Sequence, residues 1–348
     1  MMIVDCFRHT QRGNTMKKAF ESFIKEKAKA YQTEAYKGER ILSSWLNEEA
    51  QKNFMQELRE RSNFLQSINW LTVTELNGKS LFGALDGTTT GRKQDERHRS
   101  LLIYRNEYQT QETDSGVFVP WLLIDELSSL QEDFEKNYTA LTDTQFILDM
   151  LQIGWCGESV AQDTQAADLS DVNIGWLAQL KQKKPAHVIS NGKKTGKIEL
   201  FSDDADYKNL NELATALRQK LPEHYQNRND LVFFVGSELA AKEGAIYVSP
   251  AQNQQPGKDT SLNSHYLANY YGGMPAIIPP CFPSKGAVVT TFRNLSIYTQ
   301  KNSIYRAIYD DGDKLGVINS YRRNDGYVIE KMDLMAAIEH KNVVFGGK

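Results

Sequence analysis

Side chains alternate with a period of two between residues 294 and 330, and this pattern constrains the fold more than any other feature of the chain. Leu295 and Ile297 share one side of a first run, and Ile304 and Ile308 share one side of a second. Successive side chains of a β-strand point to opposite faces of a sheet, so this period predicts strands. The C-terminal part is therefore expected to be an antiparallel meander.

Two short stretches of turn-forming residues divide this meander. The sequence Asp-Asp-Gly-Asp at 310–313 and the sequence Asn-Asp-Gly at 324–326 are each predicted to join two strands. The first stretch lacks the alternate ligands and the closing glutamate of a calcium-binding loop. Asn294 begins an N-glycosylation sequon, Asn-Leu-Ser, which we expect to be unused because the N-terminal and cysteine patterns indicate no secretory route.

Four segments have apolar residues at the spacing of an amphipathic helix: 16–32, 47–69, 129–153 and 209–221. Asn47 is a predicted N-cap of the second, and Ser129 and Asn209 begin capping boxes that open the third and fourth. The helix from Ser129 would be about 37 Å long and is expected to cross one face of a sheet. The first two are either surface helices of the main domain or an extended arm that docks on a neighbouring molecule.

Helical and strand-like patterns alternate between residues 209 and 243. The helix from Asn209 is expected to end at Pro222, and "DLVFFVG" from Asp230 reads as a short buried strand. The stretch "SELAAKEGA" from Ser237 then predicts another helix. Together with the C-terminal meander, this order indicates an α+β fold.

Residues 70–118 are expected to form a long hairpin or flap, because two strand-like runs enclose a centre rich in glycine, threonine and charged residues. Gly83, Gly87 and Gly91 recur there at intervals of four, which is not the glycine spacing of a dinucleotide-binding loop. The stretch "NGKKTGKIE" at 191–199 also fails the phosphate-loop pattern and is expected to be a hairpin turn.

The composition is that of a folded protein with about two domains. The chain has 348 residues, of which 40% are hydrophobic and 24% charged. Its 41 Lys and Arg against 44 Asp and Glu show no basic excess, which argues against sequence-specific DNA binding. Asp5 interrupts the N-terminal apolar residues, so neither a signal peptide nor a membrane span is expected, and Met16 is a second candidate for the initiating residue.

The residue types that carry catalysis do not occur in catalytic patterns. Three scattered cysteines fit a reducing compartment without a metal framework, and the six histidines never have the spacing of a zinc-binding helix. Cys281, between two prolines, is expected to be a small buried side chain, and the acid pair Asp310–Asp311 a turn. We therefore expect no metal, no cofactor and no enzymatic activity. Projecting segments and sheet edges point to protein contacts instead.

Five long stretches in a fixed order carry a resemblance to a known family. They include "ERSNFLQSINWLTVTELNGKSLF" and "DLVFFVGSELAAKE", and they span 60–82, 169–190, 230–243, 272–283 and 294–330. In these stretches the chain resembles the major capsid proteins of P2-type tailed bacteriophages, which have the Hong Kong 97 capsid fold.

The resemblance implies a subunit with an N-terminal arm, an extended loop, a peripheral domain with a long spine helix, and an axial domain. The implied segments are an N-terminal segment that contacts a scaffold or is processed at 1–45, the N-arm helix at 46–69, the extended loop at 70–118, the peripheral domain at 119–185, the axial domain at 186–299, and the return to the peripheral domain at 300–348.

The same resemblance implies a function and a set of partners. Subunits of the family form hexamers and pentamers of an icosahedral shell, so the first expected partner is a second copy of this chain. Further implied partners are a scaffolding and maturation protease, a portal protein, and packaged double-stranded DNA bound without sequence specificity. The implied location is the virion, assembled in the bacterial host cytoplasm without a membrane.

Candidate assembly contacts lie in the extended loop and on the N-arm helix. They are Lys79, Phe82, Gly83, Gly87, Gly91 and Arg92 of the loop, and Phe54 and Leu58 of the helix. Some shells of this fold join subunits through lysine–asparagine isopeptide bonds, but exposed loop lysines such as Lys79 and Lys93 are common, so crosslinking is not expected.

Two other functions stay open at this point. The first is a cellular nanocompartment shell of the same fold, which would enclose an enzyme in place of DNA. The second is a soluble α+β enzyme or ligand-binding protein whose pocket is formed by "NYYGGMPAIIPP" at 269–280.

Overall fold

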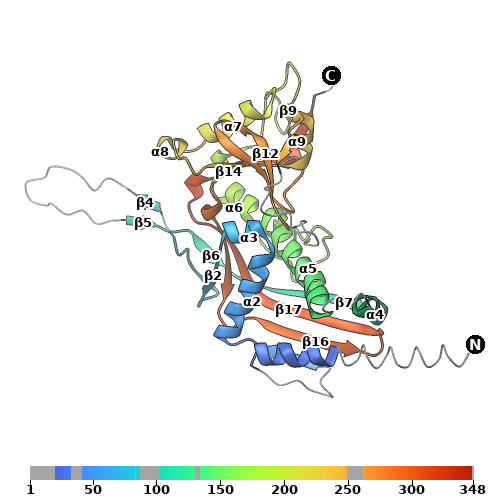
Figure 1. Cartoon of the computed structure of the whole chain (residues 1–348). Helices are drawn as coiled ribbons and strands as arrows, with labels where there is room; N and C mark the ends of the chain where they lie inside the picture. Colours follow the sequence, from blue (N-terminus) through green and yellow to red (C-terminus); the bar gives the residue numbers. More distant parts are fainter. Residues whose placement is uncertain are drawn as a thin grey trace, which may run out of the picture.

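Two large sheets, one of six strands and one of seven, occupy the two ends of the body, and a long hairpin projects from its side (Figure 1). The computed structural model describes residues 20–32, 41–82, 84–86, 102–129, 134–248 and 262–346. Helices and sheets are mixed along the chain, which confirms the predicted α+β class.

The six-stranded sheet is organised around one long strand. Its members are β1 (Ile41–Trp45), β2 (Asn69–Val73), β7 (Gln111–Pro120), β15 (Leu295–Gln300), β16 (Tyr305–Asp311) and β17 (Gly316–Ile329). β15 and β16 follow one another along one edge of β17, both antiparallel to it, and β7 pairs with the other edge. β2 and β1 pair with β15 and β16 on the outside. The antiparallel pairing is thus confirmed, but the predicted meander order is wrong, because β15 and β16 both pair with β17 and not with each other.

One of the two predicted turns is confirmed and the other is wrong. β16 ends at Asp311 and β17 begins at Gly316, so the acidic stretch joins two strands. β17, however, continues without a break through 324–326. A Cβ atom on Gly326 would lie 2.7 Å from the carbonyl oxygen of Gln109. Glycine is therefore required there by the close approach of a neighbouring segment, and not by a turn.

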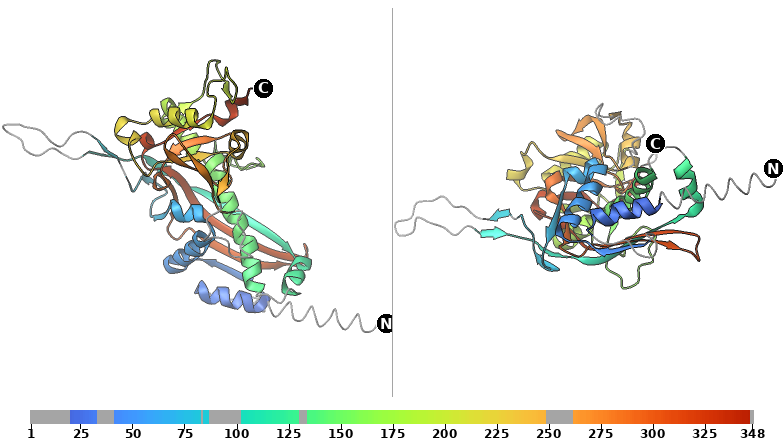
Figure 2. Two further views of the ribbon diagram at one scale, coloured as in Figure 1. Left: turned by 45° about the horizontal axis from the view of Figure 1, so that its top comes forward. Right: turned by 60° about the horizontal axis from the view of Figure 1, so that its bottom comes forward.

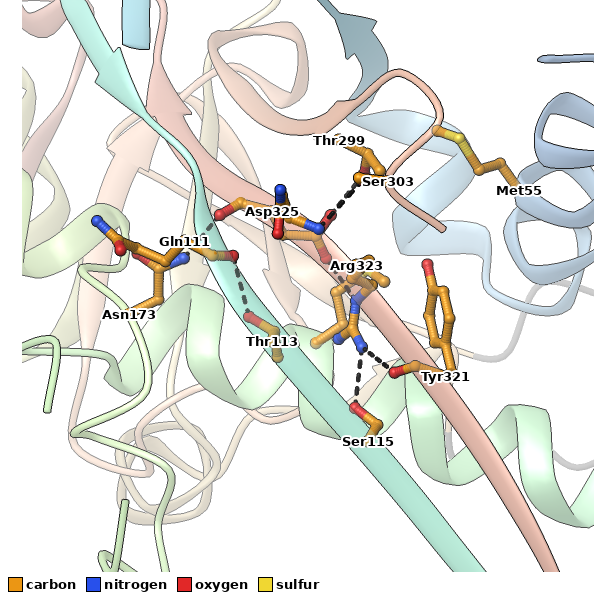
Figure 3. A network of polar contacts seen from close by, with 12 residues as sticks. Met55, Gln111, Thr113, Ser115, Asn173, Thr299, Ser303, Tyr321, Arg323 and Asp325 are labelled. Carbon is orange, nitrogen blue, oxygen red and sulfur yellow. Dashed lines mark hydrogen bonds and ion pairs between the residues drawn. The ribbon is translucent and has the colours of Figure 1, made fainter. Parts of the chain in front are cut away.

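A buried polar network explains why β17 stays extended (Figure 3). Arg323 Nε donates to Asp325 Oδ2 at 2.6 Å, and both side chains are buried. The hydroxyl of Thr299 donates to Asp325 Oδ1 at 2.6 Å and accepts the indole N–H of Trp70 at 2.9 Å. Arg323 Nη1 also donates to Ser115 Oγ at 2.9 Å. The network therefore links β17 to β15, β2 and β7.

Helices cover one face of the six-stranded sheet (Figures 1 and 2). This layer includes the helix at 20–30, α2 (Glu48–Arg61), α3 (Asn63–Ser67), α4 (Trp121–Ser129), α5 (Phe134–Cys156) and α6 (Trp176–Lys183). Tyr321 of β17 contacts Phe54 of α2 and Phe146 of α5, with ring centroids 5.0 and 5.4 Å apart. Arg322, the next residue of β17, is exposed on the opposite face.

The predicted N-terminal helices are both present. Asn47 caps α2 by accepting the amide of Ala50 at 2.8 Å, as expected. In the described part of the first segment, Phe20 and Ile24 are fully buried in the main core. These residues therefore form a helix of the subunit's own core, and not an arm that reaches away from it.

The long helix exists, but its predicted start is wrong. Ser129 is the last residue of α4 instead of the N-cap of the long helix, and Glu132 lies outside the described residues. The described part of the long helix, α5, begins at Phe134 and ends at Cys156. The apolar residues from Trp121 onward form α4, and the Trp121 indole donates to Asp310 Oδ1 at 3.0 Å, beside the end of β16.

The seven-stranded sheet has its own core. Its order is β11 (Tyr247–Val248), β12 (His265–Tyr271), β13 (Met274–Ile278), β10 (Val232–Val235), β14 (Ala287–Thr290), β18 (Ala336–Ile338) and β8 (Val188–Ile189). α7 (Leu210–Gln219) packs on it and is capped by Asn209, which accepts the amide of Glu212 at 2.9 Å. The predicted helix and the buried strand β10 are confirmed.

Several short elements lie outside the two large sheets and the helical layer. They are α8 (Glu223–Gln226), α9 (Ser237–Glu243), the pair β9 (Ile198–Leu200) and β19 (Val343–Phe345), and 3-10 helices at Pro185–His187, Phe292–Asn294, Met332–Leu334 and His340–Asn342.

Two strands pair across the expected domain divisions. β15, expected in the axial domain, pairs with β17 in the six-stranded sheet, and β18, expected in the peripheral domain, pairs with β14 in the seven-stranded sheet. The stretch 269–280 is not a pocket loop. Gly272 and Gly273, with φ of 58° and 75°, form a two-residue turn between β12 and β13.

The sequon at Asn294 is buried. Its side chain is 2% exposed, and its amide nitrogen donates to Thr290 Oγ1 at 3.1 Å and to the carbonyl of Lys331 at 3.0 Å. Its oxygen accepts the amide of Lys331 at 2.8 Å. Asn294 therefore has a structural role in joining the two sheets, and a sugar could not be attached in the folded subunit.

Removing the carboxylate of the buried pair should strongly destabilise the fold. We expect Asp325→Ala to lower the free energy of unfolding of the unassembled subunit by about 3–5 kcal/mol, because it leaves the Arg323 guanidinium buried without its counter-charge. Denaturant titration measures the loss.

The neighbouring exposed pair supplies the control. Arg322 and Glu112 form an ion pair on the open face of the same strands, and Glu112→Ala should cost less than about 1 kcal/mol because water screens both charges. Equal losses for the two variants would show that the buried network is not what holds β17.

Candidate assembly surfaces

The hairpin predicted at 70–118 is the most prominent projecting feature of the described chain (Figures 1 and 2). It leaves the six-stranded sheet at β2 and returns to it at β7. Its legs pair antiparallel as β3 (Asn77–Lys79) with β6 (Glu107–Gln109), and farther out as β4 (Ala84–Asp86) with β5 (Leu102–Tyr104). Such a segment buries little of itself against its own chain and is available to a neighbour.

Apolar side chains are exposed along the first leg of this hairpin. Leu81 and Phe82 are 48% and 49% exposed, and Leu76 is exposed nearer the sheet. Clustered apolar groups on a surface mark a contact site more often than single ones do. Lys79 lies on the same leg and is also exposed. The structure thus places two of the predicted contact residues, Lys79 and Phe82, on an accessible surface.

The remaining predicted contacts do not lie there. Phe54 and Leu58 are 2% and 0% exposed and belong to the subunit's own core, because the apolar face of α2 packs on the sheet. They are corrected from assembly contacts to core residues. Gly83, Gly87, Gly91 and Arg92, together with Lys93, lie outside the described residues.

Two buried side chains of the sheet hold the base of the hairpin. The amide of Leu81 donates to the hydroxyl of Tyr298 at 2.8 Å, and the amide of Phe82 donates to Glu330 Oε2 at 3.2 Å. The Tyr298 hydroxyl in turn donates to Glu330 Oε1 at 2.7 Å, and Ser296 Oγ donates to the same oxygen. Because these two side chains hold the base of the hairpin, we call Tyr298 and Glu330 its base pair; the term refers here to amino-acid side chains and not to nucleotides.

The environment of this base pair shifts both pKa values. Burial raises the pKa of Glu330 above its ordinary value near 4.5, although hydrogen bonds from Ser296, Tyr298 and the Phe82 amide act in the opposite direction. Burial, reinforced by the adjacent Glu330 charge, raises the pKa of Tyr298 far above 10. Tyr298 therefore stays a neutral donor at any physiological pH.

Sequence reasoning missed two further exposed apolar patches. Leu122 and Leu315 lie with Phe118 at the far end of the six-stranded sheet. Ile246 and Tyr247 lie at or beside β11, the edge strand of the other sheet, with Val248 and Tyr270 also exposed nearby. The apolar run at 117–124 could have indicated the first patch. A strand or helix at the end of a sheet cannot bury all of its side chains, so a run in which every residue is apolar must expose some of them.

Metal-ligating side chains and cysteines of the described residues can be assessed directly. Among them no group of three or more His, Cys, Asp or Glu side chains is placed to hold a metal ion. Burial raises the pKa of both Cys156 and Cys281 to about 11, so each thiol stays protonated and is a poor nucleophile. Within the same residues, no helix has the length and apolar character needed to cross a membrane.

Comparison with known proteins assigns the chain to a family. A family model described as the phage major capsid protein, P2 family, matches residues 19–341. The chain belongs to this family. The capsid proteins of Escherichia phage P2 are 26% identical over 298 residues, which cover 80% of this chain and 82% of that protein. The major capsid protein of Serratia phage KSP20 is 26% identical over 301 residues, covering 81% and 84%.

A solved structure shows the fold. A chain of the satellite phage P4 procapsid that includes the size determination (Sid) protein has a TM-score of 0.68 and 24% identity, covering 85% of this chain and 91% of that one. The capsid protein therefore has the Hong Kong 97 fold, as the resemblance implied. Its family is one of structural phage shell proteins, which decides between the phage capsid and the nanocompartment. As a capsid protein it forms a homo-oligomeric shell and is a component of the virion.

The raised pKa of Glu330 predicts a pH dependence with a definite sign. A carboxyl group whose pKa is higher in the folded state binds protons more readily there, so its stabilisation is fully present below pH 4.5 and is lost as the pH rises through the folded-state pKa. The capsid protein should therefore gain stability relative to Glu330→Gln as the pH falls toward 4.5. Denaturant titrations of both unassembled subunits at several pH values measure the difference. A constant difference, or one that falls on acidification, would contradict this assignment.

Proposed function

We propose that the capsid protein assembles into hexamers and pentamers of an icosahedral head that encloses double-stranded DNA. The observation that carries the proposal is the hairpin, which projects from the body and exposes Leu81 and Phe82. In a monomer these apolar side chains would stay exposed to water, whereas in a shell each hairpin can lie across the next subunit and bury them.

Repeated contacts of this kind suit a closed shell. A hairpin that binds a different surface on the next subunit makes a heterologous contact, and such contacts close into rings when the rotation between subunits allows it. Each contact can be modest, because the contacts act together once the shell is closed. Weak single contacts also let wrongly placed subunits leave before closure.

The two other apolar patches are proposed as further subunit contacts. The patch with Leu122 and Leu315 lies at the outer end of the six-stranded sheet, and the patch with Ile246 and Tyr247 lies at the edge of the seven-stranded sheet. Edge strands with free backbone groups are usually protected in monomeric proteins. In a shell, neighbouring subunits provide that protection.

The domain assignment follows the two sheets. We assign the six-stranded sheet and its helices to the peripheral domain, with α5 as the spine helix, and the seven-stranded sheet to the axial domain. Relative to the expected division, β15 moves to the peripheral domain and 336–345 to the axial domain. The N-arm at 46–69 and the extended loop at 70–118 keep their expected limits.

The enclosed DNA requires no reading of its sequence by this chain. The formal net charge is −3, and contacts to phosphates alone carry no sequence information. The proposed partners are a scaffold with a maturation protease and a portal protein, with assembly in the host bacterial cytoplasm. The proposal includes processing within 1–45 and no catalytic activity of the shell itself.

Electron microscopy of negatively stained particles tests the proposed assembly. The capsid protein, produced together with its proposed scaffold, should form closed shells or tubes. A protein that remains monomeric under every condition of co-expression would overturn the proposal.

Deletion of 84–98 should separate folding from assembly. The deleted stretch lies beyond the base of the hairpin, so the body keeps its sheets and its unfolding midpoint should change little. Shells should fail to form or should dissociate on dilution, because one contact of every subunit is lost. Microscopy and sedimentation measure assembly, and normal shells from the deletion variant would exclude this role of the hairpin.

A single substitution tests the exposed apolar contact more sharply. Phe82→Ser should leave the stability of the subunit within about 0.5 kcal/mol, because the side chain is half exposed, yet it should reduce the yield of shells severalfold. Phe82→Leu is the matched control, since it keeps an apolar group at the same place and should assemble nearly as well as the original protein. Equal shell yields from the serine and leucine variants would remove Phe82 from the contact.

A further inference from the structure

In its described residues, the hairpin is attached to the body by a few polar contacts near its base, one of which is donated by Lys183 Nζ of α6 to the carbonyl of Glu107 at 3.1 Å. In the described part of the first leg, beyond β3, these are the two backbone amides of Leu81 and Phe82. In the second leg, Asn106 Nδ2 donates to the carbonyls of Ile329 and Glu330 at 2.7 and 3.2 Å. Both legs are therefore held at the same place, the end of β17.

The groups that accept these hydrogen bonds are fixed by the sheet. Tyr298 lies within β15 and is completely buried, and Glu330 directly follows β17 and is 2% exposed. A buried carboxylate that accepts hydrogen bonds forms stronger and more directional bonds than a neutral acceptor in water. The base pair is thus a rigid acceptor for a segment that is otherwise far from the body.

This arrangement determines which way the exposed apolar side chains face. The amides of Leu81 and Phe82 bond inward to the base pair, and their side chains are half exposed. Tyr108 of the second leg packs edge-on against the Tyr298 ring, with centroids 5.1 Å apart, so the same tyrosine supports both legs. Loss of the base pair would leave β3 and β6 paired with each other, with fewer contacts to fix their angle to the body.

We propose that Tyr298 and Glu330 are positioning residues for assembly, which fix the direction in which the hairpin leaves the subunit. The proposal rests on the proposed function, because the direction matters only if the hairpin contacts a neighbouring subunit. A fixed direction lowers the entropy lost on contact, so it favours one geometry of shell over others.

Amide hydrogen exchange on the unassembled subunit tests the positioning role directly. In Tyr298→Phe, the amide of Leu81 should exchange about fivefold faster or more, as expected for the loss of its hydrogen bond. The amide of Phe82 should also exchange faster, because its acceptor Glu330 loses the hydroxyl group that orients it. Tyr327→Phe is the matched control. The Tyr327 hydroxyl is also buried, but it donates to the carbonyl of Met150 on α5 at 2.8 Å instead of to the hairpin. This variant should lose comparable stability without changing exchange at Leu81 or Phe82.

Assembly provides the second measurement. Tyr298→Phe should give fewer shells and a wider range of particle shapes than Tyr327→Phe at equal subunit concentration. Asn106→Ala changes only the hairpin side of the base and should also speed exchange at Leu81 and Phe82 and reduce the number of shells. If Tyr298→Phe fails to fold, this variant tests the positioning role in its place. Equal exchange at Leu81 and Phe82 in all variants, or equal assembly of Tyr298→Phe and Tyr327→Phe, would overturn the proposal.

The exchange measurement also separates this inference from the proposed function. If the original protein forms no shells, the proposed assembly fails, while exchange at Leu81 and Phe82 still shows whether the base pair holds the hairpin. If shells form normally from every variant and exchange changes as expected, the base pair holds the hairpin but its direction does not guide assembly, and the positioning role is rejected.

Discussion

The buried ion pair between Arg323 and Asp325 is the interaction on which the six-stranded sheet depends. It lies in β17, the long strand with which β7, β15 and β16 all pair, and it reaches β15, β2 and β7 through Thr299, Trp70 and Ser115. Two charges are stable in such a place only because they compensate each other, and the hydroxyl groups of Thr299 and Ser115 add further hydrogen bonds to the pair. The helices, the hairpin and Asn294 all take their positions from this sheet.

The six-stranded sheet fixes the position of the hairpin that leaves it. Its first leg continues from β2 and its second leg leads into β7, so its two ends are anchored beside β15 and β17. Tyr298 and Glu330 then belong to the same two strands or follow them directly. A segment with little core of its own can thereby carry Leu81 and Phe82 in a defined direction, which is the property that a shell contact requires.

The sequence predicted which helices and strands are present better than it predicted where they begin and end or what they contact. The period of two correctly gave β15, β16 and the start of β17, and the caps at Asn47 and Asn209 are present, because these signals act within a few residues. The turn at 324–326 was wrong because Asp325 is held by residues far away in the sequence. Phe54 was assigned to a contact although its helical spacing indicated only an apolar face, and sequence alone does not tell which surface covers such a face. The base pair of the hairpin had no sequence signal, since a tyrosine and a glutamate 32 residues apart match no motif.

The attachment of the hairpin also has a mechanical consequence. β2 is parallel to β15, and β7 is antiparallel to β17 along its whole length, so the two legs grip the sheet from opposite sides. A pull on the hairpin along the strands would strain all of these backbone hydrogen bonds together, in shear, instead of opening them one after another as in a zipper. The hairpin is therefore built to bear tension, and a shell that swells from within would be restrained by the strands that are hardest to peel apart.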